Sequence, residues 1–379
     1  MNFSFTEEQN MLRDSISKFV QDQYEFTTRE KLAKSDAGFS AENWQTFAEL
    51  GWLSVPFTEE QGGFGGGVAD NVVVMEELGK GLVLEPYLAT VLLFGGLLRD
   101  GGTAAQQENL IPAIIGGELQ GAVAFAEKQS RFDLNNVETT AQSSGDGFVI
   151  NGEKSVVING AAADKLIVAA RTSGESISDS GVSLFVVDAS AAGVTKTPFR
   201  MMDGQMVANV AFKDVTVAAA DLVGEQDQGV ALLQKVVQEA TVAVGAEAVG
   251  IMDKLKNTTV EYTKTREQFG VAIGKFQALQ HRMVEMFMAC EQTRSLLYRA
   301  VCSVAEGKPE AAQDVLALKV MVGRAGKLVG DEAFQIHGGI GMTDELDVGH
   351  YVKRLMMINV LFGDADYSQQ KFADLSLAG

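Results

Sequence analysis

The stretch Thr265-Arg266-Glu267-Gln268-Phe269-Gly270, followed by residues 271–277, separates two long patterns of apolar residues at helical spacing. A second stretch, Gln335-Ile336-His337-Gly338-Gly339-Ile340-Gly341, ends the next such pattern. The apolar residues recur at helical intervals over about 230–255, 277–305 and 311–336, which predicts three long amphipathic helices. Long helices of this kind usually pack antiparallel, so residues 228–379 are predicted to form a four-helix-bundle-like C-terminal domain.

Residues 120–227 have a different pattern. Segments 147–154, 165–170, 182–188 and 207–217 are short, rich in β-branched residues and bounded by Gly, Asp or Asn. This pattern predicts strands joined by tight turns. No helical stretch separates them and no GxGxxG follows a strand, so we expect an antiparallel sandwich or barrel and not a Rossmann sheet.

The first section, residues 1–119, is again predicted to be helical. Thr6 is a suitable N-cap for a helix whose first turn carries Glu7 and Glu8. Further helices are predicted near 41–50 and 69–79. The fold class is therefore α+β, with an N-terminal α-helical domain (1–119), a middle β domain (120–227) and a C-terminal helical bundle (228–379).

Charge and composition exclude several classes of function. The net charge of −19 argues against nucleic-acid binding, which needs a basic face. The N-terminus reads as neither a signal nor a transit peptide, and no apolar stretch reaches the roughly 18 residues of a membrane span. We therefore expect a cytoplasmic protein. The histidines His281, His337 and His350 lack the spacing of a metal cluster, so no metal site is predicted.

The order of helices, strands and helices, combined with four motifs, resembles the acyl-CoA dehydrogenase family over essentially the whole chain. The first two motifs are Phe5-Thr6-Glu7-Glu8-Gln9 with Leu12-Arg13-Asp14, and Gly147-Phe148-Val149-Ile150-Asn151-Gly152-Glu153-Lys154 followed by Asn159-Gly160. The other two are the stretches quoted first, and that pair is highly specific.

The resemblance implies an FAD-dependent enzyme acting on CoA thioesters. Family members remove the α proton with a carboxylate and pass the β hydrogen as hydride to flavin N5. They are typically tetramers built as pairs of dimers, with each flavin lying across a dimer interface and electron-transfer flavoprotein as the expected acceptor.

In such a dimer, two of the motifs approach the ADP half of the neighbour's FAD. Carried over by resemblance, these contacts fall on Arg266, Phe269, Gln277, Gln335 and Gly339. A pyrophosphate suits a guanidinium fork, and a glycine pair lets the backbone approach a ligand closely. The alternative for Arg266 is a surface salt bridge with a nearby acid.

The residues expected beside the flavin ring depart from the family pattern. Ala126 stands where the family has a threonine that contacts the flavin, and Phe132 where it has a serine. The family's Trp-Ile-Thr after the hairpin is replaced by Val156, Val157 and Ile158, whose side chains cannot donate a hydrogen bond.

The family's base is also replaced. The usual Glu-Gly-Thr near the C-terminus is here Phe362-Gly363-Asp364, and the alternative position on the first long helix of the last domain is Ala240. The catalytic base is therefore unknown. Asp364 and Glu239 are candidates, since a carboxylate buried near a flavin can be tuned to act as a base. Asp366 is another candidate, but the residue pattern favours a solvated or capping role for both Asp364 and Asp366.

The residues expected to contact a neighbour's ADP half are kept, whereas those expected to contact the chain's own flavin ring are replaced. The sequence in this respect resembles the small subunits of heteromeric acyl-CoA dehydrogenases, of the kind that break down dicarboxylic acids (pimeloyl-CoA) or steroid side chains. We expect an acyl-CoA dehydrogenase of fatty acid or steroid catabolism, in a homo- or hetero-oligomer with shared sites. The alternatives are a non-catalytic subunit that completes a partner's FAD site, and a flavin oxidase or monooxygenase.

Overall fold

The computed structural model describes residues 5–378, which divide into two compact units. We call residues 5–31, 68–83 and 241–378 the helical unit, and residues 32–67 and 84–240 the sheet unit. The predicted boundaries at 119/120 and 227/228 stay predictions, because this grouping by contacts divides the N-terminal section between the two units.

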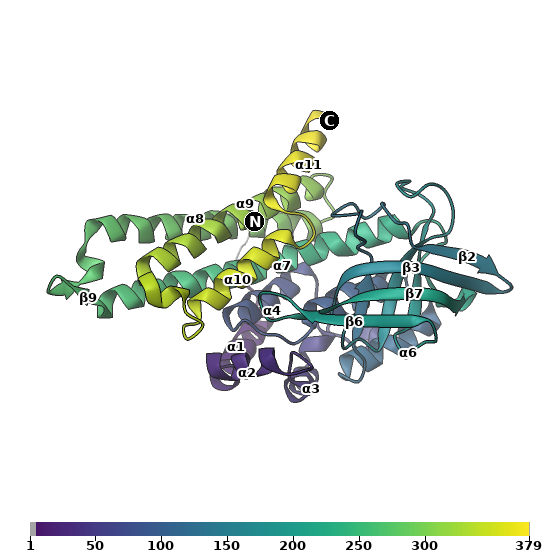
Figure 1. Ribbon diagram of the computed structural model, residues 1–379, viewed down its shortest axis with the longest axis horizontal. Coiled ribbons are helices and arrows are strands. Elements are labelled where there is room, and N and C mark those ends of the chain that lie inside the picture. Colours follow the sequence, from purple (N-terminus) through teal and green to yellow (C-terminus); the bar gives the residue numbers. More distant parts are fainter. Residues whose placement is uncertain (1–4, 379) are drawn as a thin grey trace. The chain divides into compact units, whose positions relative to one another are not determined.

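The helical unit is built on α7 (Gly229–Thr265), α8 (Gln277–Ala305), α9 (Ala311–His337) and α10 (Val348–Val360), which lie side by side (Figure 1). The first residues of α7 belong to the sheet unit. The three long helices expected from apolar spacing are confirmed. Gly250 of α7 lies against α4 (Val68–Lys80), where a Cβ atom would be 2.1 Å from the Glu76 carbonyl oxygen, so glycine permits this close approach.

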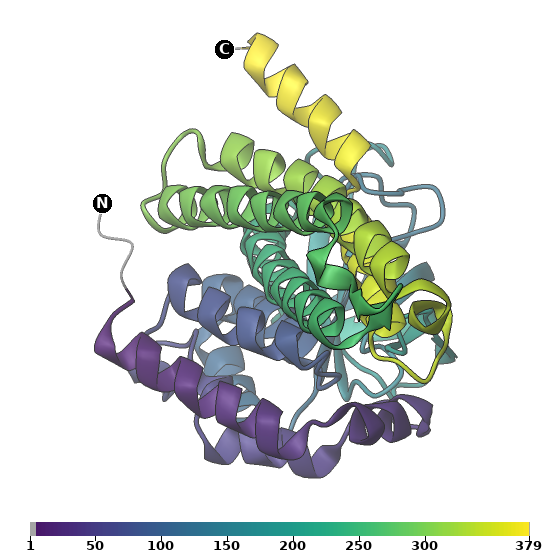
Figure 2. The same cartoon turned by 90° about the vertical axis from the view of Figure 1, so that its left-hand side faces the viewer.

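Three further helices complete this unit. Helix α1 (Glu7–Gln23) begins at Thr6, whose side chain accepts the Gln9 amide as the sequence predicts, and packs beside α4 (Figure 2). Helix α2 (Phe26–Lys34) starts in the helical unit and crosses into the sheet unit. Helix α11 (Ala365–Ala378) packs on α9 with its first turns, and its C-terminal end projects away from the bundle (Figures 1 and 2).

The sheet unit contains, within its described residues, one eight-stranded sheet in the order β6-β7-β3-β2-β4-β5-β8, with β1 paired to β4. The strands are β1 (Gly121–Ala124), β2 (Thr140–Ser144), β3 (Gly147–Ile158), β4 (Lys165–Arg171), β5 (Val182–Asp188), β6 (Val194–Arg200), β7 (Met206–Ala218) and β8 (Leu222–Val223). Each of the four predicted strands is present. The purely antiparallel prediction is wrong at two pairings, since β4 runs parallel to β1 and to β2.

The sheet curls around a single apolar core. Phe148 of β3 and Phe185 of β5 come from strands that are not neighbours, yet their rings lie 5.0 Å apart. Inward side chains such as Ile150, Leu166 and Val210 are buried in the same cluster. The longer helical segments that lie wholly in this unit are α3 (Ala41–Glu49), a π-helix η3 (Tyr87–Phe94), α5 (Gly95–Gly101) and α6 (Ala104–Ile115). The π-helix, unlike the others, is a rare form often found at functional sites.

Candidate functional site

The first motif of interest forms a hairpin at one end of the helical unit. Helix α7 ends at Thr265, and the two-residue strands β9 (Glu267–Gln268) and β10 (Val271–Ala272) follow it. The Ile273 amide donates to the Arg266 carbonyl at 2.8 Å and closes the hairpin. Phe269 at its tip has a φ of 54° and is 92% exposed. An exposed aromatic ring on a strained turn is typical of a site that binds a ligand or another chain.

The end of α9 reaches the same end of the unit. The Tyr262 ring of α7 stacks on His337 with centroids 4.4 Å apart, and its hydroxyl donates to the His337 carbonyl at 3.4 Å. Arg282 of α8 and Glu332 of α9 form an ion pair at 2.8 Å nearby. These contacts bring the two marked stretches of sequence together at one end of the helical bundle.

All five residues carried over by resemblance are exposed at this end: Arg266, Phe269, Gln277, Gln335 and Gly339. The Arg266 guanidinium makes no ion pair within residues 5–378, so the surface salt bridge considered as its alternative is not formed there. A Cβ atom at Gly338 or Gly339 would meet nothing within 4 Å, so the backbone lies open to a ligand. The group fits an ADP moiety: a guanidinium for the pyrophosphate, open backbone and an aromatic ring.

Two of the segments expected beside the flavin ring are joined in the sheet unit. The Ser155 amide of β3 donates to the Ala126 carbonyl at 2.8 Å, which joins the hairpin to the segment after β1. A register shift between Lys154 and Val157 marks a bulge, and Val156 in it has a φ of 54°. A β-branched residue in this region is strained, and such strain persists where the surroundings impose it, often at functional sites.

Positive φ recurs in the segments that the resemblance connects with the flavin. Besides Val156 it occurs at Arg131, Asn159, Phe269 and Phe362. These four residues and Val156 therefore adopt a backbone conformation that non-glycine residues rarely adopt. Ile158, at the end of β3, is half-buried and offers no hydrogen-bond donor.

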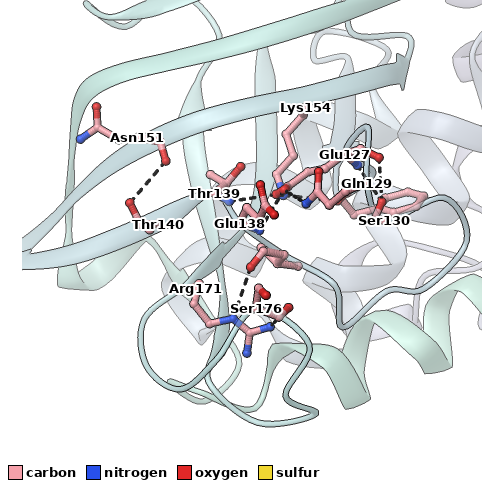
Figure 3. Close-up of polar contacts among 12 residues, drawn as sticks. Glu127, Gln129, Ser130, Glu138, Thr139, Thr140, Asn151, Lys154, Arg171 and Ser176 are labelled. Atoms are coloured by element: carbon pink, nitrogen blue, oxygen red, sulfur yellow. Dashed lines mark hydrogen bonds and ion pairs between the residues drawn. The ribbon is translucent and has the colours of Figure 1, made fainter.

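A buried ion pair holds the ring-side segments in place (Figure 3). The fully buried Lys154 ammonium donates to Glu127 Oε1 at 2.6 Å and to the Phe125 carbonyl at 3.3 Å. Glu127 also accepts the amides of Glu138 and Thr139 at 2.9 and 3.1 Å. One pair thereby fixes the segment after β1, the strand β3 and the start of β2.

The charges of this pair are set by opposing effects. Burial alone would raise the pKa of Glu127, but the charge and hydrogen bond of Lys154 outweigh it and lower that pKa to about 2. Burial lowers the pKa of Lys154 to about 8 against the attraction of Glu127. The attraction between the two groups therefore favours the charged form of each.

Arg171 at the end of β4 holds the neighbouring loops. Its guanidinium donates to the carbonyls of Asn135 and Ser176 at 2.6 and 2.7 Å, and to those of Ser178 and Ser180 at 3.1 and 2.8 Å (Figure 3 shows the bond to Ser176). The planar guanidinium of Arg171 thus joins these loop segments to the end of β4.

Two of the three candidate bases, Glu239 and Asp364, accept hydrogen bonds from neighbouring groups. Glu239 of α7 accepts a hydrogen bond from Arg99 at 2.8 Å, and Arg99 also binds Asp100 through two bonds. Asp364 precedes α11 and accepts the Tyr367 amide at 2.8 Å, as an N-cap does. Asp366 is exposed in the first turn of α11. A base role for any of them stays a prediction.

The turn that carries Phe362 is held by a buried lysine. Lys319 of α9 donates to the carbonyls of Ile358, Asn359 and Gly363 at 2.9, 2.7 and 2.6 Å. Burial lowers the pKa of Lys319 to about 7, while Asp364 favours its charged form. Three bonds from Lys319 thus hold the turn at which the resemblance places Phe362 in the position of the family's base.

Sequence reasoning missed the partners of these buried groups. Lys154 lies in a motif, but nothing in a single sequence pairs it with Glu127, 27 residues away. The one available signal was a lysine at an inward position of the alternating strand 147–158, which requires a buried counter-charge. Lys319 gave a similar signal on the apolar face of α9.

Within residues 5–378 no helix is long and apolar enough to cross a membrane. The same residues contain no group of three or more His, Cys, Asp or Glu side chains that could hold a metal ion.

Comparison with known proteins agrees with this geometry. Family models for the acyl-CoA dehydrogenase N-terminal, middle and C-terminal domains match residues 6–118, 122–215 and 227–373. The chain is 30% identical to the probable acyl-CoA dehydrogenase YngJ of Bacillus subtilis, over 97% of each chain.

Two solved structures are similar over nearly the whole chain. One is butyryl-CoA dehydrogenase from Megasphaera elsdenii, with a TM-score of 0.92 and 28% identity over 100% of each chain. The other is the ChsE4-ChsE5 complex from Mycobacterium tuberculosis, with a TM-score of 0.90 and 27% identity over 99% of this chain and 98% of that chain.

Proposed function

The chain belongs to the acyl-CoA dehydrogenase family, and we propose that it serves FAD-dependent α,β-dehydrogenation of an acyl-CoA thioester as one chain of an oligomer with shared flavin sites. The observation that carries this proposal is the group of five exposed residues at one end of the helical unit. Its guanidinium, open glycine backbone and exposed aromatic ring suit the ADP half of an FAD that another chain also binds.

In this proposal Arg266 binds the pyrophosphate, and Phe269 and Gln277 cover the nucleotide from the hairpin and the start of α8. Gln335 and the backbone at Gly339 complete the contact from α9. When bound, FAD would serve as the oxidant for the β hydrogen of the acyl group, which leaves as hydride. The chain's own part is to position that cofactor and to keep water from it.

The ring side of the proposed site depends on another chain. Ile158 cannot donate to the flavin and Phe362 cannot accept the α proton. A partner whose sequence carries the family's threonine and glutamate would supply both. The similarity to ChsE4-ChsE5, a complex of two named chains, supports a heteromer of this kind. Electron-transfer flavoprotein is the proposed acceptor of the electrons.

An exposed apolar face on α8 supports assembly. Val284, Phe287 and Met288 lie at i, i+3 and i+4 and are 54%, 51% and 47% exposed. An apolar stripe of this width on a charged protein suits burial against another acyl-CoA dehydrogenase-like chain, in the dimer or tetramer proposed here.

The test is an anaerobic titration of the purified FAD-loaded oligomer with acyl-CoA thioesters of increasing length, ending with a steroid-side-chain thioester. We expect at least one of them to abolish the visible absorbance of the oxidised flavin, while free CoA leaves it unchanged. A flavin that no thioester bleaches would leave the chain as a non-catalytic FAD-binding subunit. Rapid oxygen consumption with a bleaching substrate would instead identify an oxidase.

A further inference from the structure

One pair of stacked rings joins the two stretches of the helical unit that are proposed to bind ADP. Tyr262 lies one turn before the end of α7, and its ring stacks on the imidazole of His337, the last residue of α9. The ring centroids are 4.4 Å apart and the ring planes are inclined by 27°. The Tyr262 hydroxyl also donates to the His337 carbonyl at 3.4 Å. Each ring therefore belongs to a helix that leads directly into one of the two stretches.

Both rings are close in the chain to the groups that would contact ADP. The Arg266 amide donates to the Tyr262 carbonyl at 2.9 Å, so Arg266 lies one helical turn from the stacked ring. On the other side, His337 is followed by Gly338, whose φ of 66° turns the chain out of α9. A Cβ atom at Gly341 would lie 2.9 Å from His337 Cβ, so the glycine turn folds back onto this histidine. The position of the open glycine backbone thus depends on where His337 lies.

The surroundings of His337 favour its neutral form. His337 is 4% exposed, and its Nδ1 lies 2.9 Å from the Ala333 carbonyl, which can only accept, so Nδ1 carries a proton. A second proton would bind Nε2 and place a charge on a buried ring. Burial lowers the pKa of His337, and it outweighs the opposite effects of the bond to Ala333 and of the charge of Asp347.

The titratable groups around this ring come from the neighbouring helices. Tyr262 stacks on it from α7, and Asp347, just before α10, acts on it through its charge. The neighbouring turns of α7, α8 and α9 also hold two ion pairs, Arg282 with Glu332 at 2.8 Å and Lys264 with Glu261 at 2.6 Å. The charges of these four groups are compensated within each pair, whereas His337 gains a charge when it is protonated.

We propose that the Tyr262–His337 stack positions the two halves of the ADP site, and that protonation of His337 loosens the stack and weakens the binding of FAD. The inference rests on the proposed function and adds a regulation of the same site by pH. A charged imidazole needs water or an acceptor at Nε2, which favours its departure from the buried stack. The glycine backbone after His337 would then shift relative to Arg266, and the two could no longer hold one ligand together.

The test measures the dissociation constant of FAD for the oligomer that contains this chain, by flavin fluorescence between pH 8 and about pH 5.5. Because the neutral ring holds the site together, affinity should be full above the ordinary pKa of about 6.5 and should fall as the pH drops through the lowered pKa of His337. One group changes the constant by at most about tenfold per pH unit, so we expect binding to be about 2- to 10-fold weaker at the acid end. Circular dichroism at each pH checks that the oligomer stays folded.

Three variants separate positioning from folding. His337→Ala removes the stack and should weaken FAD binding about 3- to 10-fold at pH 8, and adding Tyr262→Ala should weaken it little further, because the two rings act as a pair. His337→Phe keeps a ring for Tyr262 but has no proton to gain, so its affinity should lie between wild type and His337→Ala and should not change with pH. The control is His281→Gln, which removes an exposed imidazole of α8 and should keep the pH response of the wild type.

The failure of this inference can be distinguished from the failure of the proposed function. Equal FAD binding by the wild type at both ends of the pH range would show that His337 does not regulate the site. A pH response of His337→Phe as large as that of the wild type would show the same, and the proposed function would stand in either case. If Arg266→Ala and His337→Ala both bind FAD like the wild type at pH 8, no ADP group is held at this end of the unit and both are overturned.

Discussion

Replacing Lys154 by methionine is expected to lower the free energy of unfolding by about 3–5 kcal/mol, the largest effect of any single change considered. The substitution leaves Glu127 buried with its charge uncompensated, although the two amides of Glu138 and Thr139 still donate to it. The midpoint of denaturant unfolding, followed by circular dichroism at neutral pH, measures the loss.

A matched exposed pair provides the control. Lys165 on β4 binds Asp188 at 3.0 Å in the same unit, but its side chain is 32% exposed. Lys165→Met should therefore cost at most about 1 kcal/mol. The double variant Glu127→Leu with Lys154→Met should recover much of the loss, because it removes both charges. Equal effects of Lys154→Met and Lys165→Met would show that the buried pair does not stabilise the unit.

Replacing Arg266 by alanine is expected to weaken FAD binding by the oligomer about 10- to 100-fold. The guanidinium has no ion pair in the described part of the chain, so its removal disturbs no contact within the helical unit and loses only the charged bonds to the pyrophosphate. The dissociation constant of FAD, measured by flavin fluorescence after removal and re-addition of the cofactor, reports the change.

Two variants distinguish the guanidinium fork from charge alone. Lys264→Ala removes a neighbouring positive charge that is 60% exposed and paired with Glu261, and it should leave the affinity nearly unchanged. Arg266→Lys keeps the charge without the fork and should fall between wild type and Arg266→Ala. If all three variants bind FAD like the wild type, Arg266 does not contact the cofactor.

Much of the fold could be predicted because each element carries its own periodic pattern. Helix α8 spans the predicted range 277–305, and the strand at 182–188 has its predicted bounds, since apolar spacing and flanking turn residues are local properties. The parallel pairing of β1 with β4 was not predictable in this way, because the partner of a strand is decided by contacts between distant residues.

The same distinction between local patterns and distant contacts applies to the candidate site. The residues Arg266 and Gln335 could be singled out because each lies in a compact motif, and Tyr262 stacking on His337 brings those motifs together. The buried pair of Lys154 and Glu127 could not be predicted from the sequence, because the two residues are 27 positions apart and no local pattern connects them.

The most direct test of the shared flavin site is the visible spectrum of the purified chain, with the ratio of FAD to chain measured after denaturation. It is recorded for the chain alone and for the chain co-expressed with an acyl-CoA dehydrogenase-like partner. We expect a nearly colourless protein alone and one FAD for each pair of unlike chains in the complex. One tightly bound FAD for each chain of a homogeneous sample would contradict the shared site and show that Val156, Ile158 and Phe362 are tolerated beside the chain's own flavin.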